Sequence, residues 1–485
     1  MHTNSTMKPS IPALALLFAA PAAAASCESL LRLSLPNTTI TSAASVDSPP
    51  SCRVSATLRP TSDSDIKIEV WMPTSGWNGD FQAVGNGGWS GSINSSAMAK
   101  AVAAGYATSS TDTGHAGSSA SFAPGHPEKL IDYAYRSEHE MTVQAKAIIA
   151  AFYGKAPRFS YWNGCSAGGK QGLKEAQRYP EDFNGIVAGS PAANWTGRAA
   201  QAIWVAQAVH KDDASFIPPE KYPAIHRAVL AACDRLDGVE DGVLEDPARC
   251  HFDPKVLECK GDNTPDCLTP PQVEAARKIY APSTNPRTGQ RLYSGLAPGS
   301  ELGWNTWGGA RPLSIATDYF RFVVFENPAW DFRILDFDKD VERAEKLDRT
   351  RINALDPNLR PFFAHGGKLL QYHGWSDPQI SPGNSVEYYE SVVKEMGGAA
   401  KLQGSYRLFM VPGMAHCGGG DGTSNFDMMA ALRSWVEEQH APERVEASRV
   451  RNGKTDRTRP LCSYPQTAVY KGSGSIDDSA NFSCH

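Results

Sequence analysis

Hydrophobic and polar positions follow two different periodicities along the chain. From about Ser26 to Pro73 they alternate with a period of two, as in Ile66 to Trp71, which predicts antiparallel strands at the edge of a sheet. Further on, short apolar runs alternate with stretches of helical spacing such as 132–153, which ends at Gly154. This order continues to about residue 193 and predicts an α/β fold with a doubly wound, mostly parallel sheet.

The alternation of strand and helix patterns is interrupted between residues 194 and 360. This stretch holds four of the cysteines, many Pro, Gly and Asp residues, and an aromatic cluster at 319–325. Strand and helix patterns resume after it, at 368–374, about 385–396, 406–411 and about 426–439. We therefore expect residues 194–360 to form a large inserted lid domain over a catalytic domain made of residues 26–193 and 361–485.

The first 25 residues have the pattern of a secretory signal peptide. Lys8 precedes an apolar stretch at 11–20, and the small residues at 23–26 form a cleavage region. A frayed apolar terminus is the alternative. No later segment is long and apolar enough to cross a membrane, so we expect a secreted or periplasmic protein.

Charge gives no sign of a polyanionic partner. The 485 residues carry a net charge of -5, with a pI near 6.2, and their Lys and Arg residues are scattered. We therefore expect neither a nucleic acid nor a membrane as partner, and favour a small substrate. The sequence does not indicate an oligomeric state.

Ten cysteines in an exported chain predict disulfides. The sequence contains no C-x-x-C pair, so it does not indicate a metal cluster. Eight of them fall into local couples, which leaves Cys165 to pair with Cys417. The predicted local pairs are Cys27 with Cys52, Cys233 with Cys250, Cys259 with Cys267, and Cys462 with Cys484.

The pentapeptide at 164–168, Gly-Cys-Ser-Ala-Gly, lies between a strand-like run at 158–162 and a helix-like run at 170–178. A serine held in a sharp strand-to-helix turn has an exposed hydroxyl, and the tight turn requires small neighbours. We interpret Ser166 as a nucleophile. The alternative is an ordinary turn, because glycine and serine are common in turns.

A glycine-rich stretch, 85–91, directly follows a strand-like run at 81–84. In α/β-hydrolases this position supplies one backbone donor to the oxyanion. Gly87 or Gly88 is the candidate, together with the N–H of Ala167. The alternative is a flexible loop without a ligand.

Asp377 and His416 each follow a predicted strand, and the order Ser166, Asp377, His416 is the one found in α/β-hydrolases. A bridge between Cys165 and Cys417 would hold the nucleophile and the base together. We expect His416 to be the general base and Asp377 its orienting acid. Three weaker competitors are expected at the pocket wall or in structural roles, namely Asp112, His115 and His373.

A cysteine beside the nucleophile, the Gly-Trp-Ser-Asp run at 374–377, and the Ala-His-Cys run at 415–417 resemble the tannase and feruloyl esterase family, which also contains mono(hydroxyethyl) terephthalate hydrolases. The resemblance covers nearly the whole mature chain. It implies an α/β-hydrolase fold and a serine esterase of aromatic carboxylic esters, with the Cys165–Cys417 bridge as its signature.

An acidic loop at 233–243 places carboxylates around glycines, which suits a hard cation such as Ca²⁺ as well as it suits a solvated acidic turn. The resemblance implies a structural calcium site. Its side-chain ligands would be Asp234, Asp237 and Asp241, and its carbonyl ligands Val239 and Val243. No organic cofactor is implied.

Feruloyl-type, hydroxycinnamoyl esters are the expected substrates. Phe320, Phe325 and Arg321 are candidate substrate contacts, although core packing for the aromatic rings and a surface role for the arginine are the alternatives. Two other readings stay open: a tannase or mono(hydroxyethyl) terephthalate hydrolase with the same triad, and an inactive, calcium-stabilised binding protein on a hydrolase scaffold.

Overall fold

The computed structural model describes residue 1, residues 26–349 and residues 351–485, so the predicted signal peptide, 1–25, lies outside the described residues except for Met1. A nine-stranded sheet in the order β1-β2-β3-β5-β4-β6-β7-β10-β11 forms the centre. Its strands are β1 (Thr38–Asp47), β2 (Pro50–Leu58), β3 (Ile66–Pro73), β4 (Phe81–Val84), β5 (Ala107–Thr111), β6 (Ser160–Cys165), β7 (Gly185–Gly189), β10 (Lys368–Gly374) and β11 (Tyr406–Val411).

The sheet is antiparallel at one edge and parallel elsewhere. Strands β1, β2, β3 and β5 pair antiparallel in that order. All pairs from β5 across to β11 are parallel. This confirms the predicted α/β fold with a mostly parallel sheet.

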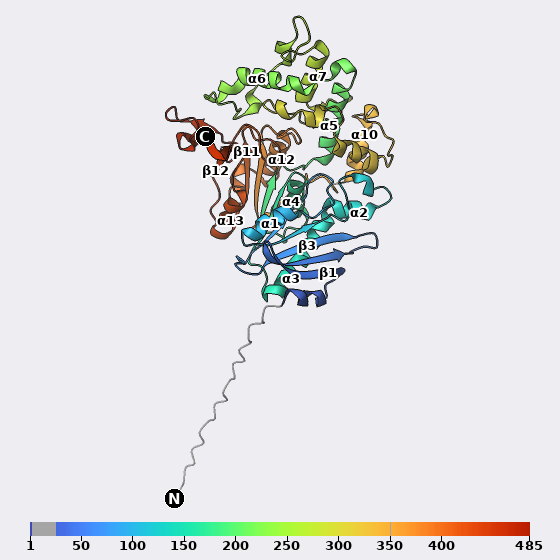
Figure 1. Ribbon diagram of the computed structural model, residues 1–485, viewed down its shortest axis with the longest axis vertical. Helices are drawn as coiled ribbons and strands as arrows, with labels where there is room; N and C mark the ends of the chain where they lie inside the picture. Colours follow the sequence, from blue (N-terminus) through green and yellow to red (C-terminus); the bar gives the residue numbers. More distant parts are fainter. Residues whose placement is uncertain (2–25, 350) are drawn as a thin grey trace.

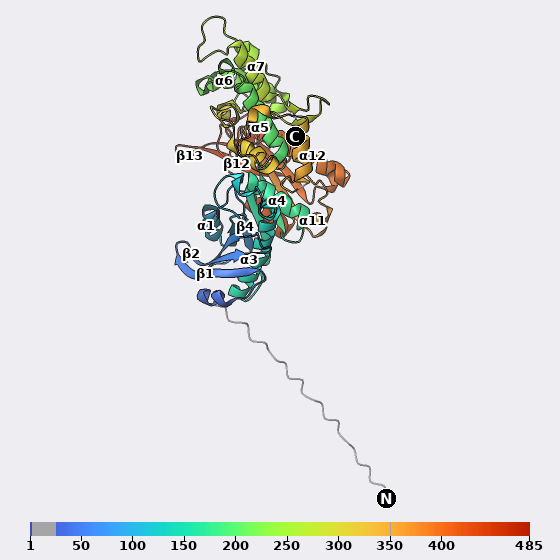
Figure 2. The ribbon, with the colours of Figure 1, turned by 90° about the vertical axis from the view of Figure 1, so that its right-hand side faces the viewer.

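Helices cover both faces of the parallel part (Figure 2). Every residue of β7 and β11 is buried, as expected for parallel strands covered on both sides. One face packs against α1 (Ser95–Ala103) and α13 (Met428–Glu438). The other packs against α3 (Ser137–Tyr153), α4 (Ala167–Arg178) and α12 (Gly383–Met396).

Two local predictions differ from the structure. The helix expected from residue 132 begins with a π-helical turn, Asp132–Arg136, before α3. The strand expected at 158–162 is shifted to β6 (Ser160–Cys165), because its pairing with β7 continues until Cys165 lies opposite Gly189. The turn that contains Ser166 therefore starts directly at the end of the ladder.

The residues between β7 and β10 add no described strand to the large sheet, and most of their buried side chains belong to a hydrophobic cluster that also includes Trp89, Tyr133 and Ala167. Figure 1 shows α5, α6, α7 and α10 at the end of the sheet opposite β1 and β3. The helices of this insertion are α5 (Trp195–Val209), α6 (Tyr222–Cys233), α7 (Pro270–Tyr280), α8 (Asn305–Gly308), α9 (Ser314–Asp318), α10 (Lys339–Asp348) and α11 (Arg360–Ala364). A small hairpin, β8 (Ser283–Thr284) with β9 (Arg291–Tyr293), also belongs to it.

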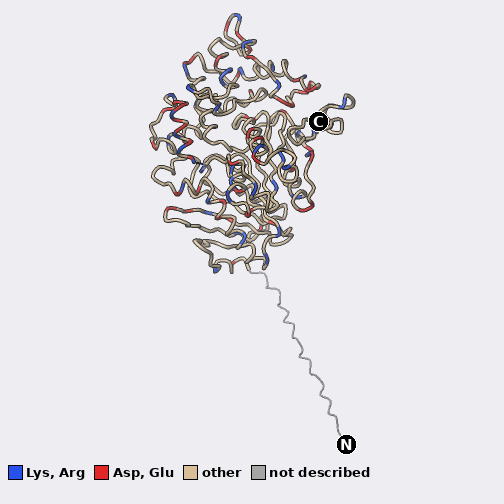
Figure 3. The backbone as a smooth tube through the Cα atoms, turned by 180° about the vertical axis from the view of Figure 1, so that it is seen from behind, with Lys and Arg blue, Asp and Glu red and all other residues tan. Residues whose placement is uncertain are grey.

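The chain ends in two hairpins and contains one further short helix, α2 (Pro127–Ile131). The hairpins are β12 (Arg444–Arg451) with β13 (Lys454–Cys462), and β14 (Ala468–Tyr470) with β15 (Phe482–Cys484). Basic and acidic residues are interspersed along the whole backbone (Figure 3). Within the described chain, none of the helices has the length and apolar character needed to cross a membrane.

Candidate active site

Ser166 occupies a strained turn between β6 and α4. Its backbone has φ 65° and ψ -124°, a region that residues with a side chain rarely adopt. The turn leaves no room for larger neighbours: a Cβ on Gly164 would lie 2.4 Å from the carbonyl oxygen of Gly168, and one on Gly169 would lie 2.4 Å from that of Gly189. The small residues of the motif are therefore required by packing.

Asp377 and His416 meet beyond the ends of β10 and β11. His416 Nδ1 lies 2.7 Å from Asp377 Oδ2, and Asp377 Oδ1 accepts the backbone N–H groups of Gln379 and Ile380 at 2.8 and 3.0 Å. Asp377 is fully buried, which by itself would raise the pKa of its carboxyl group. The charges and hydrogen bonds of His416 and His373 outweigh burial and hold this pKa well below its usual range.

His373 is a second histidine on the same carboxylate. Its Nε2 lies 3.2 Å from Asp377 Oδ2 and 3.0 Å from the carbonyl oxygen of Ile380, while its Nδ1 lies 2.7 Å from Ser385 Oγ. Because a carbonyl oxygen can only accept, Nε2 carries the proton. Nε2 thus holds the Asp377 loop while Nδ1 contacts Ser385 of α12, so both ring nitrogens are engaged.

The two other residues considered as alternatives, His115 and Asp112, form hydrogen bonds within loops. His115 Nε2 lies 2.9 Å from the carbonyl oxygen of Trp89, and its Nδ1 lies 3.2 Å from Thr113 Oγ1. Asp112 accepts the backbone N–H groups of Lys67 and Gly114. Neither residue lines the cavity that contains Ser166.

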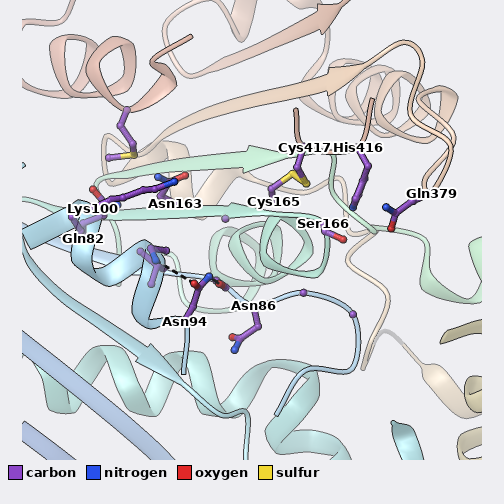
Figure 4. Close-up of a pocket in the computed structure, with 18 of the residues that line it drawn as sticks. Gln82, Asn86, Asn94, Lys100, Asn163, Cys165, Ser166, Gln379, His416 and Cys417 are labelled. Carbon is purple, nitrogen blue, oxygen red and sulfur yellow. Dashed lines mark hydrogen bonds between the residues drawn. A yellow bond between two sulfur atoms is a disulfide. The ribbon is translucent and has the colours of Figure 1, made fainter. Parts of the chain in front are cut away.

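Ser166 and His416 line one cavity of about 1140 Å³ together with Cys165 and Cys417. Figure 4 shows the His416 ring extending towards the Ser166 side of this cavity. Nδ1 is engaged by Asp377, so Nε2 is the nitrogen available to the serine. Among the described contacts no hydrogen bond joins Ser166 to His416, and such contacts are often long until a substrate binds.

The glycine-rich loop after β4 is fixed against the start of α4. The backbone N–H of Asn86 donates to Gln171 Oε1 at 3.0 Å, and its carbonyl accepts the N–H of Gly168 at 2.8 Å. Close approach depends on glycine, because a Cβ on Gly85 would lie 2.6 Å from the Cα of Gly168. Within the described chain the N–H groups of the three predicted oxyanion donors, Gly87, Gly88 and Ala167, have no acceptor.

The structure forms all five predicted disulfides, which account for every cysteine in the described residues. The Cys165–Cys417 bridge joins positions 252 residues apart, with their Cα atoms 6.0 Å from each other. Its two cysteines are the immediate neighbours of Ser166 and His416, so the bridge ties the turn of Ser166 to the loop of His416.

The three predicted substrate contacts lie away from the Ser166 cavity. Phe320 is fully buried and stacks on Trp330, Phe325 stacks on the same ring, and Arg321 Nε donates to the Trp330 carbonyl oxygen. None of the three lines the cavity, and their role as substrate contacts stays a prediction.

The cavity is also lined by residues that the sequence analysis did not single out. Ser314 and Ile315 come from the insertion, Gln379 from the Asp377 loop, and Ser118 from the loop after β5. Of these residues, only Gln379 could have been expected near the site from the sequence, because it lies two residues after the predicted acid, Asp377.

The predicted calcium loop supplies oxygen atoms around a small cavity. Asp237, Asp241, Val239 and Val243 line it, and Glu245, which the sequence analysis did not include, joins them. The carbonyl oxygens of Val239 and Val243 accept no hydrogen bond from a described residue. Burial, and then repulsion from Asp241 and Asp234, raises the pKa of Asp237 to about 6. Oxygen atoms with crowded carboxyl groups are the donors that a hard cation prefers.

Two arginines of β13 also reach the acidic loop. Arg457 Nη1 lies 3.3 Å from Asp241 Oδ2, and Arg459 pairs with the same oxygen. Asp234 faces the loop backbone, accepting the N–H of Gly242 at 2.9 Å. Within the described chain the side chains of His, Cys, Asp and Glu alone form no group of three arranged for a metal, so a cation here would depend on the two valine carbonyls.

Removing the Cys165–Cys417 bridge should impair turnover more than it impairs folding at moderate temperature. We expect the Cys165→Ala, Cys417→Ala double variant to lose on the order of 10²-fold in kcat, because small displacements of reacting groups have effects of that size. Ester hydrolysis measured well below the melting temperature of the variant tests this.

The matched control removes the Cys259–Cys267 bridge in the insertion, whose cysteines do not line the cavity of Ser166. It should keep kcat near that of the wild type. Full activity of the Cys165→Ala, Cys417→Ala variant would show that the bridge does not position the site.

Comparisons with known proteins agree with this geometry. The sequence model of the family described as "Tannase and feruloyl esterase" matches residues 52–485. An esterase of Xanthomonas campestris pv. campestris is 39% identical, over 98% of this chain and 93% of its own. A protein of Neosartorya fischeri named probable feruloyl esterase B-2 is 35% identical, over 93% and 90% of the two chains.

A solved structure of a relative has a similar fold. Feruloyl esterase B from Aspergillus oryzae superposes with a TM-score of 0.88 at 31% identity, covering 95% of this chain and 99% of that one. The nine-stranded sheet with its insertion is thus an α/β-hydrolase fold. The chain belongs to the tannase and feruloyl esterase family and is a carboxylic ester hydrolase.

Proposed function

We propose that the protein is a serine esterase that releases feruloyl-type, hydroxycinnamic acids from aromatic esters through an acyl-enzyme. The main support is that Ser166 and His416 line one cavity, while His416 Nδ1 lies 2.7 Å from Asp377 Oδ2. Relatives named as feruloyl esterases support this choice of acyl group.

Each residue then has one task. His416 Nε2 accepts the Ser166 hydroxyl proton as the oxygen attacks the ester carbonyl, and Asp377 stabilises the imidazolium ion. The N–H groups of Ala167 and of Gly87 or Gly88 bind the oxyanion. The leaving alcohol takes the proton from His416, and a water molecule activated by the same histidine hydrolyses the acyl-serine.

Ester hydrolysis should depend on Ser166. The Ser166→Ala variant should lose on the order of 10⁴- to 10⁶-fold in kcat, because the nucleophile and base act as a unit. An exposed serine, Ser121→Ala, is the matched control and should not change the rate. The assay measures acid release from ferulate, gallate and terephthalate monoesters with matched alcohols.

The ester panel also separates the alternatives. Faster release of gallate or terephthalate than of ferulate would reassign the enzyme to a tannase or a terephthalate monoester hydrolase with the same triad. Ligand affinity without turnover, equal in wild type and Ser166→Ala, would instead indicate an inactive binding protein.

We also propose that the acidic loop of the insertion binds a structural Ca²⁺. The oxygen atoms of Asp237, Asp241, Val239 and Val243 around one small cavity support this, and bound calcium would neutralise the crowded carboxylates. The Cys233–Cys250 bridge closes the same segment, so the ion would stabilise the insertion rather than take part in ester chemistry.

Chelation should therefore lower the melting temperature by several degrees and leave kcat, measured well below melting, nearly unchanged. Asp237→Asn should make the melting temperature insensitive to calcium, whereas the exposed Asp262→Asn should keep the response. An identical melting curve with calcium and with EDTA would contradict a metal in this loop.

Export from the cytoplasm is the third proposal. The signal-like residues 1–25 and the five disulfides support it, because such bridges persist in oxidising compartments. The intact mass of the protein from culture fluid or periplasm should lack about 25 residues at the N-terminus. Recovery of the full-length chain from the cytoplasm alone would contradict it.

A further inference from the structure

The helical segment between α2 and α3 is irregular. Its residues, Asp132–Arg136, form a π-helical turn in which the N–H of Ser137 donates to the carbonyl oxygen of Asp132, five residues earlier. Such turns are rare and occur frequently at functional sites. We call this segment the π-turn. Ester chemistry at Ser166 and His416 gives no reason for it, but the contacts made by side chains in and directly after the π-turn do.

The π-turn brings Tyr133 and Glu138 to the same side of the helix. An α-helix turns by about 100° per residue, so residues five apart would point roughly 140° away from each other. A π-turn holds one more residue in each hydrogen-bonded ring, which reduces this angle. Both side chains are buried, with exposed fractions of 2% and 1%. Tyr133 contacts the glycine-rich loop at 85–91 directly, and Glu138 reaches it through Gln171.

Tyr133 holds the loop at Gly88. Its hydroxyl group donates to the carbonyl oxygen of Gly88 at 2.8 Å, and its ring packs against that of Trp89 with the centroids 4.6 Å apart. Gly88 has φ 53°, in the left-handed region. Because glycine adopts many backbone conformations at little cost, this hydrogen bond selects one of them.

Glu138 holds the loop at Asn86. Its carboxylate accepts a hydrogen bond from Gln171 Nε2, and Gln171 Oε1 accepts the N–H of Asn86 at 3.0 Å. Burial raises the pKa of Glu138 to about 7, although the charge of Lys170 opposes this shift, so the carboxyl group is mostly ionised at pH 8. An ionised carboxylate only accepts hydrogen bonds. It therefore turns the amide nitrogen of Gln171 towards itself and the amide oxygen towards Asn86.

The two contacts lie on either side of Gly87. One holds the N–H of Asn86, and the other holds the carbonyl oxygen of Gly88. Gly87 itself has little to restrain it, because a Cβ placed there would meet no atom of the described chain within 4 Å. Donors to an oxyanion are effective when their direction is fixed before the charge develops.

We infer that the π-turn, through Tyr133 and Glu138, fixes the direction of the Gly87 and Gly88 N–H groups, and that both side chains are positioning residues for ester hydrolysis. The inference rests on the proposed function, because it takes these N–H groups as donors to the oxyanion. Neither Tyr133 nor Glu138 lines the cavity of Ser166, so each acts through the glycine-rich loop and not on the substrate.

The first test uses Tyr133→Phe and Glu138→Gln, which remove one contact each with little change of volume. Each variant should lower kcat for a ferulate ester at pH 8 on the order of tenfold and leave KM nearly unchanged, because the oxyanion forms only in the transition state. The measurements are made well below the melting temperature of each variant.

Matched controls carry the same substitutions away from the loop. The Tyr470 hydroxyl also donates to a glycine carbonyl oxygen, that of Gly474 in the terminal hairpin, at 2.6 Å. Glu175 is another buried glutamate, on α4, and its carboxyl oxygens form no hydrogen bond with the 85–91 loop. Tyr470→Phe and Glu175→Gln should keep kcat near that of the wild type. Full kcat in both Tyr133→Phe and Glu138→Gln would overturn the inference.

Hydrogen–deuterium exchange of the 85–91 segment separates this inference from the proposed function, because it needs no turnover. Tyr133→Phe and Glu138→Gln should speed exchange in this segment about tenfold, the effect of losing one hydrogen bond, and the two controls should not. If the wild type cleaves no ester, the proposed function fails, while faster exchange still supports the anchoring of the loop. Exchange as slow as in the wild type would overturn the inference even where kcat falls.

Discussion

The Cys165–Cys417 bridge is the link on which the geometry of the active site depends. Strands β6 and β11 are separated in the sheet by β7 and β10, which puts them roughly 14 Å apart at a spacing of about 4.8 Å per strand. The loops beyond the two strands close this gap until the Cα atoms of the two cysteines are 6.0 Å apart. Cys417, like Ser166, has a positive φ, so both loops turn sharply where they are joined.

The other parts of the site are held by packing and hydrogen bonds to the same framework. Asp377 is fixed by two histidines and two backbone N–H groups, which gives its carboxylate a single position although it is fully buried. The glycine-rich loop is held by the contact of Gly85 with Gly168 and by Gln171. These contacts thus give the Asp377 carboxylate and the glycine-rich loop fixed positions beside the turn of Ser166.

The surroundings of Ser166 come from two directions. The insertion contributes Ser314 and Ile315 next to the glycine-rich loop, where the Trp89 indole N–H donates to the Ile315 carbonyl oxygen at 3.1 Å. The sheet and the helices α1 and α13 line the rest of the cavity, as far as Lys100 and Arg433. The insertion shares one hydrophobic cluster with Trp89, Tyr133 and Ala167, so its packing is continuous with the residues around Ser166.

The sequence by itself determined the order of strands and helices in the large sheet, the sharp turn at Ser166 and the disulfide pairs. These features have local signals: spacing of apolar residues, small residues around Ser166, and cysteines in close couples. The tertiary structure alone decided that His373 shares Asp377, that β6 extends to Cys165, and that Phe320, Phe325 and Arg321 lie outside the cavity. It also placed Gln82 and Asn163 in the lining of the cavity that contains Ser166. Such features depend on which distant segments meet, and strands buried on both faces give no periodic signal for the residues that face a cavity.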